Sequence, residues 1–140
     1  MIAYLNFHTA AAGLNALVLG GQVLLTFVVA PTVFRALERT DAGALMGAVF
    51  RLALPFFAAA SLGGALLLFY RFEALLLGLN GVLFLLAWML LAPLVERLRS
   101  AREAGHTGAA GRFRLAHGFS QVLNLAQLGL AIFIFFRLAA

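Results

Sequence analysis

The sequence predicts an all-α integral membrane protein, a four-transmembrane-helix antiparallel bundle that forms a single domain over residues 1–140. Of the 140 residues, 64% are hydrophobic and only 11% are charged. Because a soluble domain of this size carries roughly a quarter charged residues, this chain lacks the side chains for a water-facing shell. Its apolar runs also reach the length of about 20 residues that a helix needs to cross a bilayer. Both observations favour the membrane.

Four apolar runs predict the four spans, in chain order, at about 5–34, 45–70, 72–95 and 113–138. A short charged link at 38–43 joins the first two spans, and residues 71–73 leave room only for a tight turn. The link at 96–111 is longer, basic and rich in Gly and Ala, so we expect a flexible loop there. No positive segment precedes the first run, so we expect it to be a retained helix rather than a cleaved signal.

The charged residues are distributed unequally between the two ends of the predicted bundle. All ten basic residues are Arg, and most fall at one end, with Arg51 and Arg114 just inside it: Arg35, Arg39, Arg97, Arg99, Arg102 and Arg112. The other end has only Arg71 and Arg137. The positive-inside rule then predicts a multi-pass protein of the cell (inner) membrane with both termini outside. Tyr4 and Tyr70 would lie at the outer headgroups, and the Arg-rich end would meet anionic lipid headgroups rather than nucleic acid.

The chain also repeats short sequence patterns in the same order. Ala-Pro at 30–31 recurs at 92–93, Phe-Arg-Leu-Ala at 50–53 recurs at 113–116, and Gly-Leu-Asn at 13–15 recurs at 78–80. These matches indicate two related helical hairpins, arranged as a parallel repeat with a pseudo-twofold axis along the membrane normal. The alternative is chance similarity between helices of biased composition.

Polar side chains form one stripe on the first predicted span and one on the fourth. Because the two spans are antiparallel, matching their ends places Gln22 near the depth of Asn124 and Thr26 near Ser120, so a hydrogen-bonded seam is expected. One interpretation is that the seam only holds the helices together through hydrogen bonds. The other is that it forms a binding site or pathway for a small solute, with Arg51, Arg114 and His117 at its cytoplasmic mouth. For the two Arg residues the alternative is snorkelling to headgroups. The candidate ligand-binding residues are Asn15, Gln22, Thr26, Ser120, Asn124, Gln127, Arg51, Arg114 and His117.

The histidines within the spans are expected at opposite faces of the membrane. His8 begins the first span at the outer face, and His117 begins the fourth at the inner face. About 20 residues of depth, roughly 30 Å at 1.5 Å per residue, separate them. Within one subunit they therefore cannot share a haem or a metal ion. A haem b on His8 needs another ligand or a five-coordinate iron, and no cofactor is required by the sequence.

No catalytic constellation is present in the sequence. Cysteine is absent, no acidic residue lies in the middle of a span, and there is no H-E-x-x-H pattern. A hydrolase built on Ser120 and His117 would still need an orienting acid and an oxyanion hole. We therefore lean away from an enzyme.

Three segments together resemble the transmembrane protein 205-like family. They are a glycine-led helix ending in an A-P-x-x-F turn at 20–34, an A-G-x-x-x-G-x-x-F helix start at 42–50, and an F-x-x-x-H-G-x-S-x-x-x-N helix at 113–124. The resemblance covers nearly the whole chain and implies a four-helix membrane protein without a settled activity.

More distantly, the first span is similar to that of the copper resistance protein D-like proteins and the membrane-bound protoporphyrinogen oxidases. Those proteins carry a His early in the first helix, and His8 occupies that place. In the oxidases this His is implicated in haem binding, so the resemblance implies a haem on His8. The chain has no Lys, whereas the oxidases carry an intramembrane Lys, so oxidase activity is not implied.

Three functional hypotheses follow from these patterns. The first is a small membrane protein, forming homo-oligomers or part of a larger complex, that binds or passes a small solute through the polar seam. The second is a b-type haem- or metal-binding redox protein that uses His8. The third is an accessory subunit whose helices pack on a larger membrane complex.

Overall fold

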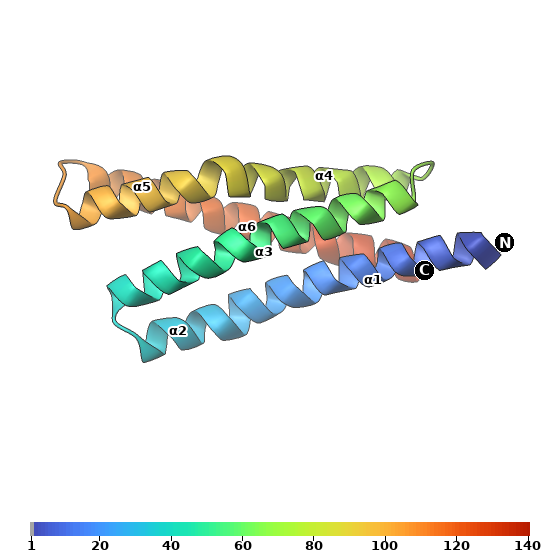
Figure 1. Cartoon of the computed structure of the whole chain (residues 1–140), viewed down its shortest axis with the longest axis horizontal. Coiled ribbons are helices and arrows are strands. Elements are labelled where there is room, and N and C mark those ends of the chain that lie inside the picture. Colours follow the sequence, from blue (N-terminus) through green and yellow to red (C-terminus); the bar gives the residue numbers. More distant parts are fainter. Residues whose placement is uncertain (1) are drawn as a thin grey trace.

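A computed structural model describes the backbone of residues 2–140 and the side chains from Asn6 onward. Over these residues the only regular secondary structure is helical, and four helical stretches are long and apolar enough to cross a membrane. The four-helix, all-α fold is therefore confirmed (Figure 1). The elements are α1 (Ile2–Leu24), η1 (Leu25–Val29), α2 (Ala30–Ala36), α3 (Arg39–Leu67), α4 (Phe72–Leu86), η2 (Ala87–Leu91), α5 (Ala92–Glu103) and α6 (Ala109–Ala139).

The helices extend further than the hydrophobic runs that predict them. α3 begins at Arg39, inside the expected link at 38–43. α5 continues to Glu103, so the expected loop at 96–111 shrinks to a turn at 104–108, with Gly105 and Gly108 in the left-handed region. Arg and Glu are good helix formers, and Glu96 and Arg99 pair across one turn of α5. Charged residues therefore continue the helix after the apolar pattern has ended.

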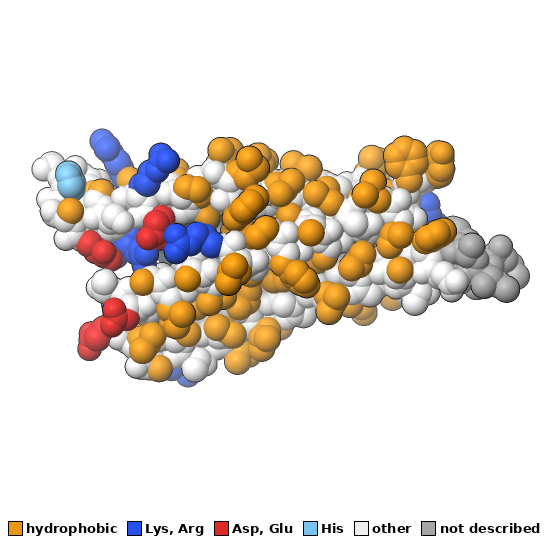
Figure 2. Space-filling model, viewed as in Figure 1, with side chains coloured by type: hydrophobic (Ala, Val, Ile, Leu, Met, Phe, Trp, Pro, Cys, Tyr) orange, Lys and Arg blue, Asp and Glu red, His pale blue; other side chains and the backbone are white. Residues whose placement is uncertain are grey.

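The four spans run antiparallel between two chemically different ends. Figure 1 places both termini and the α3–α4 turn at one end, which we call the terminal end. The other, which we call the basic end, holds the α2–α3 and α5–α6 connections. Figure 2 shows the charged side chains gathered at the basic end, while the sides of the bundle are largely hydrophobic. Tyr70 is fully exposed at the terminal end, whereas the Tyr4 side chain lies outside the described residues.

The first helix of each hairpin contains a π-helical turn directly before its Ala-Pro dipeptide. η1 precedes Ala30 and Pro31, and η2 precedes Ala92 and Pro93. A proline ring clashes with the carbonyl four residues earlier, and a wider π-turn relieves that clash. Pro55 lies inside α3 without such a turn, so proline alone does not produce it. The same local geometry thus occurs at the same stage of both hairpins, as a repeat predicts.

Two buried apolar clusters hold the spans together. The cluster toward the basic end centres on Phe57 and Phe84, whose rings pack with centroids 5.3 Å apart. The cluster toward the terminal end includes Ala11, Leu77 and Ile134. These clusters leave a layer between them, at the depth where Asn15 of α1 bonds to Ala131 of α6.

Candidate functional site

Side-chain hydrogen bonds join α1 to α6. Asn15 Nδ2 donates to the carbonyl oxygen of Ala131 at 3.0 Å. Gln22 Nε2 donates to Asn124 Oδ1 at 3.3 Å, and Asn124 Nδ2 donates to Thr26 Oγ1 at 3.0 Å. The structure therefore brings together the two polar stripes as a seam, with Gln22 opposite Asn124.

Ser120 does not take the expected place beside Thr26. Its hydroxyl donates to the carbonyl of His117 in its own helix at 2.7 Å. Serine in a helix often bonds to the preceding turn in this way, which leaves Asn124 as the partner of Thr26. The seam is therefore shorter toward the basic end than the sequence spacing suggests.

Arg51, Arg114 and His117 lie on the surface of the bundle rather than in the seam. Both Arg side chains are exposed, and among the described residues neither pairs with Glu38, Asp41 or Glu96. The last of these carboxylates is held by Arg99 at 2.6 Å. Exposure at the basic end is what the snorkelling alternative predicts for these two Arg residues.

The exposed ring of His117 packs against an aromatic neighbour in its own helix. It stacks on Phe113, with ring centroids 5.5 Å apart and planes 8° apart. The Arg102 guanidinium covers the same Phe ring, 4.1 Å from its centroid. These contacts tie the end of α5 to the start of α6, and they hold His117 at the basic end of the molecule.

His8 lies half-buried near the start of α1, far from His117. Because Asn15 meets Ala131, His8 lies level with Leu138, roughly 30 Å of helix away from His117. Within the part of the chain that the structure describes, no group of three or more His, Cys, Asp or Glu residues could hold a metal ion. The two histidines are thus separate features.

A central polar layer, made of one uncharged side chain from each spanning helix, lies at the end of the seam that is nearer to the terminal end. It consists of Asn15 (α1), Ser61 (α3), Asn80 (α4) and Gln127 (α6), none of them more than 1% exposed. The sequence stripes contained Asn15 and Gln127. Asn80 was visible only through the Gly-Leu-Asn repeat, and Ser61 carried no pattern at all.

Neighbouring contacts place the four residues at one depth. A methyl group added at Gly81, beside Asn80, would lie 2.7 Å from Cγ of Leu62, beside Ser61. A methyl group added at Gly63 would lie 3.6 Å from Cδ1 of Leu14, beside Asn15. Gln127 is one turn from Ala131, the partner of Asn15. All four therefore lie within about one helical turn, roughly 5.4 Å of depth.

The central polar layer contains donors and acceptors without partners. Among the described residues nothing bonds to Asn80 Nδ2 or Oδ1, Ser61 Oγ, Gln127 Nε2 or Asn15 Oδ1. A buried polar atom that makes no hydrogen bond costs about 1–3 kcal/mol, and most buried polar groups in native structures are paired. Asn15 joins α1 to α6 through its Nδ2, but the other polar atoms of the layer do not bond to one another.

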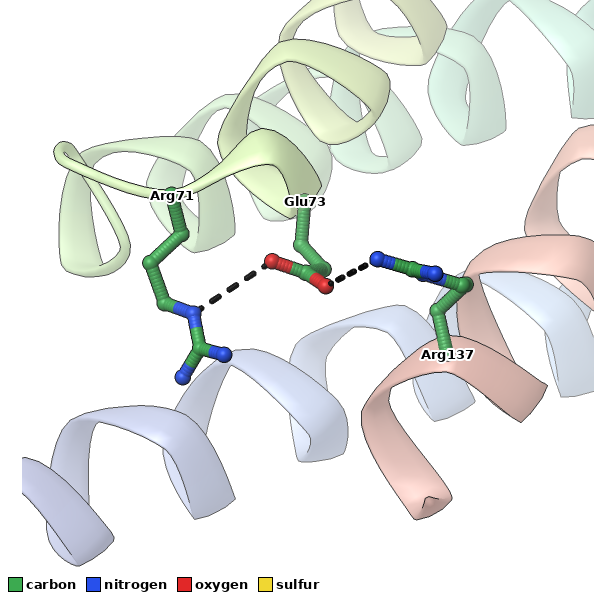
Figure 3. A network of polar contacts seen from close by, with 3 residues as sticks. All are labelled: Arg71, Glu73 and Arg137. Carbon is green, nitrogen blue, oxygen red and sulfur yellow. Dashed lines mark hydrogen bonds and ion pairs between the residues drawn. The ribbon is translucent and has the colours of Figure 1, made fainter.

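A separate ion-pair network closes the terminal end. The carboxylate of Glu73, almost fully buried, accepts from Arg137 Nη2 at 3.0 Å and lies 3.4 Å from Arg71 Nε. Figure 3 shows the Glu73 side chain between the two guanidinium groups, one from the α3–α4 turn and one from α6. These two Arg residues looked in the sequence like ordinary interfacial charges, because only the fold brings α4 and the end of α6 together.

Comparison with known proteins gives one family. A family model described as a domain of unknown function (DUF4149) matches residues 13–104, about two thirds of the chain. The matched segment contains Asn15, Ser61 and Asn80 but not Gln127. No curated protein and no solved structure matches the chain.

Proposed function

The chain belongs to the DUF4149 family, whose function is unknown, and we propose that it binds a small uncharged solute at the central polar layer. The observation that carries this proposal is Asn80. Its amide is completely buried, and neither its donor nor its acceptor has a partner among the described residues. A solute that offers both a donor and an acceptor would satisfy it.

The chemistry of the central polar layer favours a neutral ligand. Its four side chains end in three carboxamide groups, two from Asn and one from Gln, and one Ser hydroxyl group. Each of these groups can donate and accept hydrogen bonds, and none is charged. A buried ion would need a countercharge, because transfer of an isolated ion into an apolar interior is far more costly than transfer of a neutral polar group. We therefore expect a solute with amide or hydroxyl groups.

The surroundings of the layer favour binding over free passage. Toward the terminal end, the cluster that includes Ala11, Leu77 and Ile134 closes the bundle. Toward the basic end, the seam of Gln22, Asn124 and Thr26 continues the polar surface along α1 and α6. We propose that solute reaches the layer along this seam, and that passage through the protein requires the terminal cluster to open.

Thermal unfolding of the purified protein in detergent tests the site. The probes are acetamide, urea and glycerol, which are neutral, and acetate, which has the shape of acetamide but carries a charge. We expect at least one neutral probe to raise the Tm of the wild-type protein, because a ligand that binds only the folded state stabilises it. Acetate should have no such effect.

The variant Asn80→Leu should lose the response to the neutral probe, whereas Asn6→Leu should keep it. Asn6 is an exposed asparagine of α1, so it controls for the chemical change alone. If every neutral probe affects the wild-type protein and Asn80→Leu equally, the layer is not the binding site and the proposal is wrong.

A second candidate, an accessory subunit, is favoured by the first span, Asn6–Ala36. Only 11% of its apolar window is buried, against 28–33% in the other three spans, and Leu17 and Leu24 of α1 and Phe27 of η1 are among its exposed side chains. We propose that this face packs on a helix of a larger complex. Replacing Leu17 and Leu24 by Phe should weaken co-purification of a partner in mild detergent, and co-purification of no stoichiometric partner would exclude this role.

We propose that the basic end faces the cytoplasm and both termini face the outside of the cell membrane. The support is the concentration of Arg at the end with the two short connections (Figure 2). The chain has no cysteine, so His106→Cys and Ala140→Cys each introduce a single reactive thiol. An impermeant maleimide added to intact cells should label Ala140→Cys but not His106→Cys, and the reverse result would invert the topology.

A further inference from the structure

An apolar groove runs along the outside of the second hairpin. It has a volume of about 250 Å³ and lies between the η2 region and α6. The residues that shape it include Ala87, Leu90, Leu91, Leu94, Phe119 and Leu123. The groove is open to the side of the bundle, where the lipid bilayer would be.

The π-turn contributes to the shape of this groove. η2 spans Ala87–Leu91, and three of the groove residues belong to it. The wall on this hairpin extends from Leu83 to Leu94, about 16 Å of helix at 1.5 Å per residue. That length is close to half of the ~30 Å hydrocarbon core of a bilayer, so the groove matches one lipid acyl chain in the leaflet at the basic end.

Two exposed Arg residues lie just beyond the groove at the basic end. Arg97 follows Leu94 by three residues, and Arg112 precedes Phe119 by seven, so each continues the groove-lining face of its helix. Nearby, Arg99 is bound to Glu96 and Arg102 covers the ring of Phe113. Among the described residues, no carboxylate pairs with Arg97 or Arg112.

We propose that this groove binds an anionic phospholipid, with one acyl chain along the groove and the phosphate held by Arg97 and Arg112. Charge complementarity selects this occupant. An apolar partner helix would leave the two guanidinium groups unpaired, whereas a lipid phosphate offers oxygens that accept from both. Arg also snorkels readily from the edge of the hydrocarbon to the headgroups.

The single Trp of the chain gives a direct measurement. Trp88 follows Ala87 in η2 and is 39% exposed, so phospholipids with brominated chains should quench its fluorescence when they occupy the groove. The protein is reconstituted into vesicles that contain brominated phosphatidylglycerol, which is anionic, or brominated phosphatidylcholine, which is zwitterionic. In the wild type, quenching should require a roughly 25-fold lower fraction of the anionic lipid, since Arg97 and Arg112 should each contribute about a fivefold preference.

Matched charge variants separate the site from general attraction to the basic end. The double variant Arg97→Gln/Arg112→Gln should lose the preference. Arg35→Gln/Arg39→Gln removes the same charge from the basic end at exposed positions in α2 and α3 and should keep it. All four positions are exposed, so the fold should survive both changes. Equal loss in the two variants, or no loss in either, would overturn the proposal.

A variant that fills the groove tests the acyl-chain contact. Ala87→Phe should reduce quenching of Trp88 by phosphatidylglycerol to the level seen with phosphatidylcholine. If Trp88 of the wild-type protein is shielded from both lipids, a second copy or another protein covers the groove. That result would also contradict the proposal.

Discussion

Each hairpin has a buried asparagine in its first helix, and the two asparagines differ in their hydrogen bonds. Asn15 in the first hairpin and Asn80 in the second end the same Gly-Leu-Asn pattern, and both are completely buried. Asn15 donates to Ala131 across the α1–α6 contact, whereas Asn80 has no partner among the described residues. The same three-residue pattern therefore places one asparagine in a hydrogen bond between helices and leaves the other without a hydrogen bond.

The two π-turns differ in a parallel way. η1 in the first hairpin has no buried residue. η2 in the second buries Ala87 and lines the apolar groove. The two turns have the same local geometry because each precedes an Ala-Pro dipeptide, but different residues pack around them. Four predictions test whether the two hairpins are as different energetically as they are in their contacts.

The largest effect is expected from tight packing in the second hairpin. In Gly81→Ala the new methyl group would lie 2.7 Å from Leu62 Cγ and 3.2 Å from the backbone nitrogen of the same residue. Overpacking of this kind costs about 1–3 kcal/mol, and the backbone of α3 cannot easily yield. Thermal or denaturant unfolding in detergent should show a clear loss of stability. Gly78→Ala, where the nearest atom is at 3.9 Å, should be nearly neutral.

The corresponding change in the first hairpin should cost less. In Gly21→Ala the methyl group would meet the tip of the Phe57 ring at 2.6 Å, and a ring tip can rotate away more readily than backbone can. We expect the loss of stability to be smaller than for Gly81→Ala under the same conditions. An equal or larger loss would mean that Phe57 is locked against Phe84 and that the two hairpins are equally tight.

The two buried asparagines should respond differently to replacement by Leu. Asn15→Leu removes a buried hydrogen bond and should destabilise the protein by about 1 kcal/mol. Asn80→Leu replaces unpaired polar atoms with an apolar side chain of similar size, so it should leave stability unchanged or raise it. Both variants are compared by unfolding in the absence of added solute. Equal destabilisation by both would show that Asn80 has a structural partner after all.

The smallest effect is expected at the terminal ion pairs. Glu73→Gln removes the charge that Arg71 and Arg137 share, but both guanidinium groups are close to half-exposed and can be hydrated. Exposed ion pairs contribute about 0–1 kcal/mol, so a small loss of stability is expected that shrinks at high salt. A loss as large as that of Gly81→Ala would indicate that the network locks the end of α6 onto α4.

Most of the fold could be predicted from the hydrophobic runs, and the main errors have one cause. The expected loop at 96–111 was placed where hydrophobicity ends, but helix formation depends on backbone hydrogen bonds and propensity. Charged residues such as Glu96 and Arg99 therefore continue α5. The π-turns could not be predicted from proline alone, since Pro55 has none.

Contacts between polar residues could be predicted only where the side chains follow helical spacing. Gln22 and Asn124 share faces with other polar residues, so matching two antiparallel stripes was enough to pair them. Ser120 does not lie beside Thr26 as predicted, because its hydroxyl donates a hydrogen bond within its own helix. The exposure of Arg51 and Arg114 could not be predicted, because it depends on which face of each helix the neighbouring helices cover.

The sequence by itself determined that this chain has four helices long and apolar enough to cross a membrane, one basic end, and polar side chains inside the bundle. Those properties follow from composition and from periodicity along single helices. Only the tertiary structure decided that Ser61 and Asn80 join Asn15 and Gln127 in one layer, and that Glu73 meets Arg137. Contacts of this kind depend on the register and rotation of helices that are distant in sequence, which no pattern within one helix specifies.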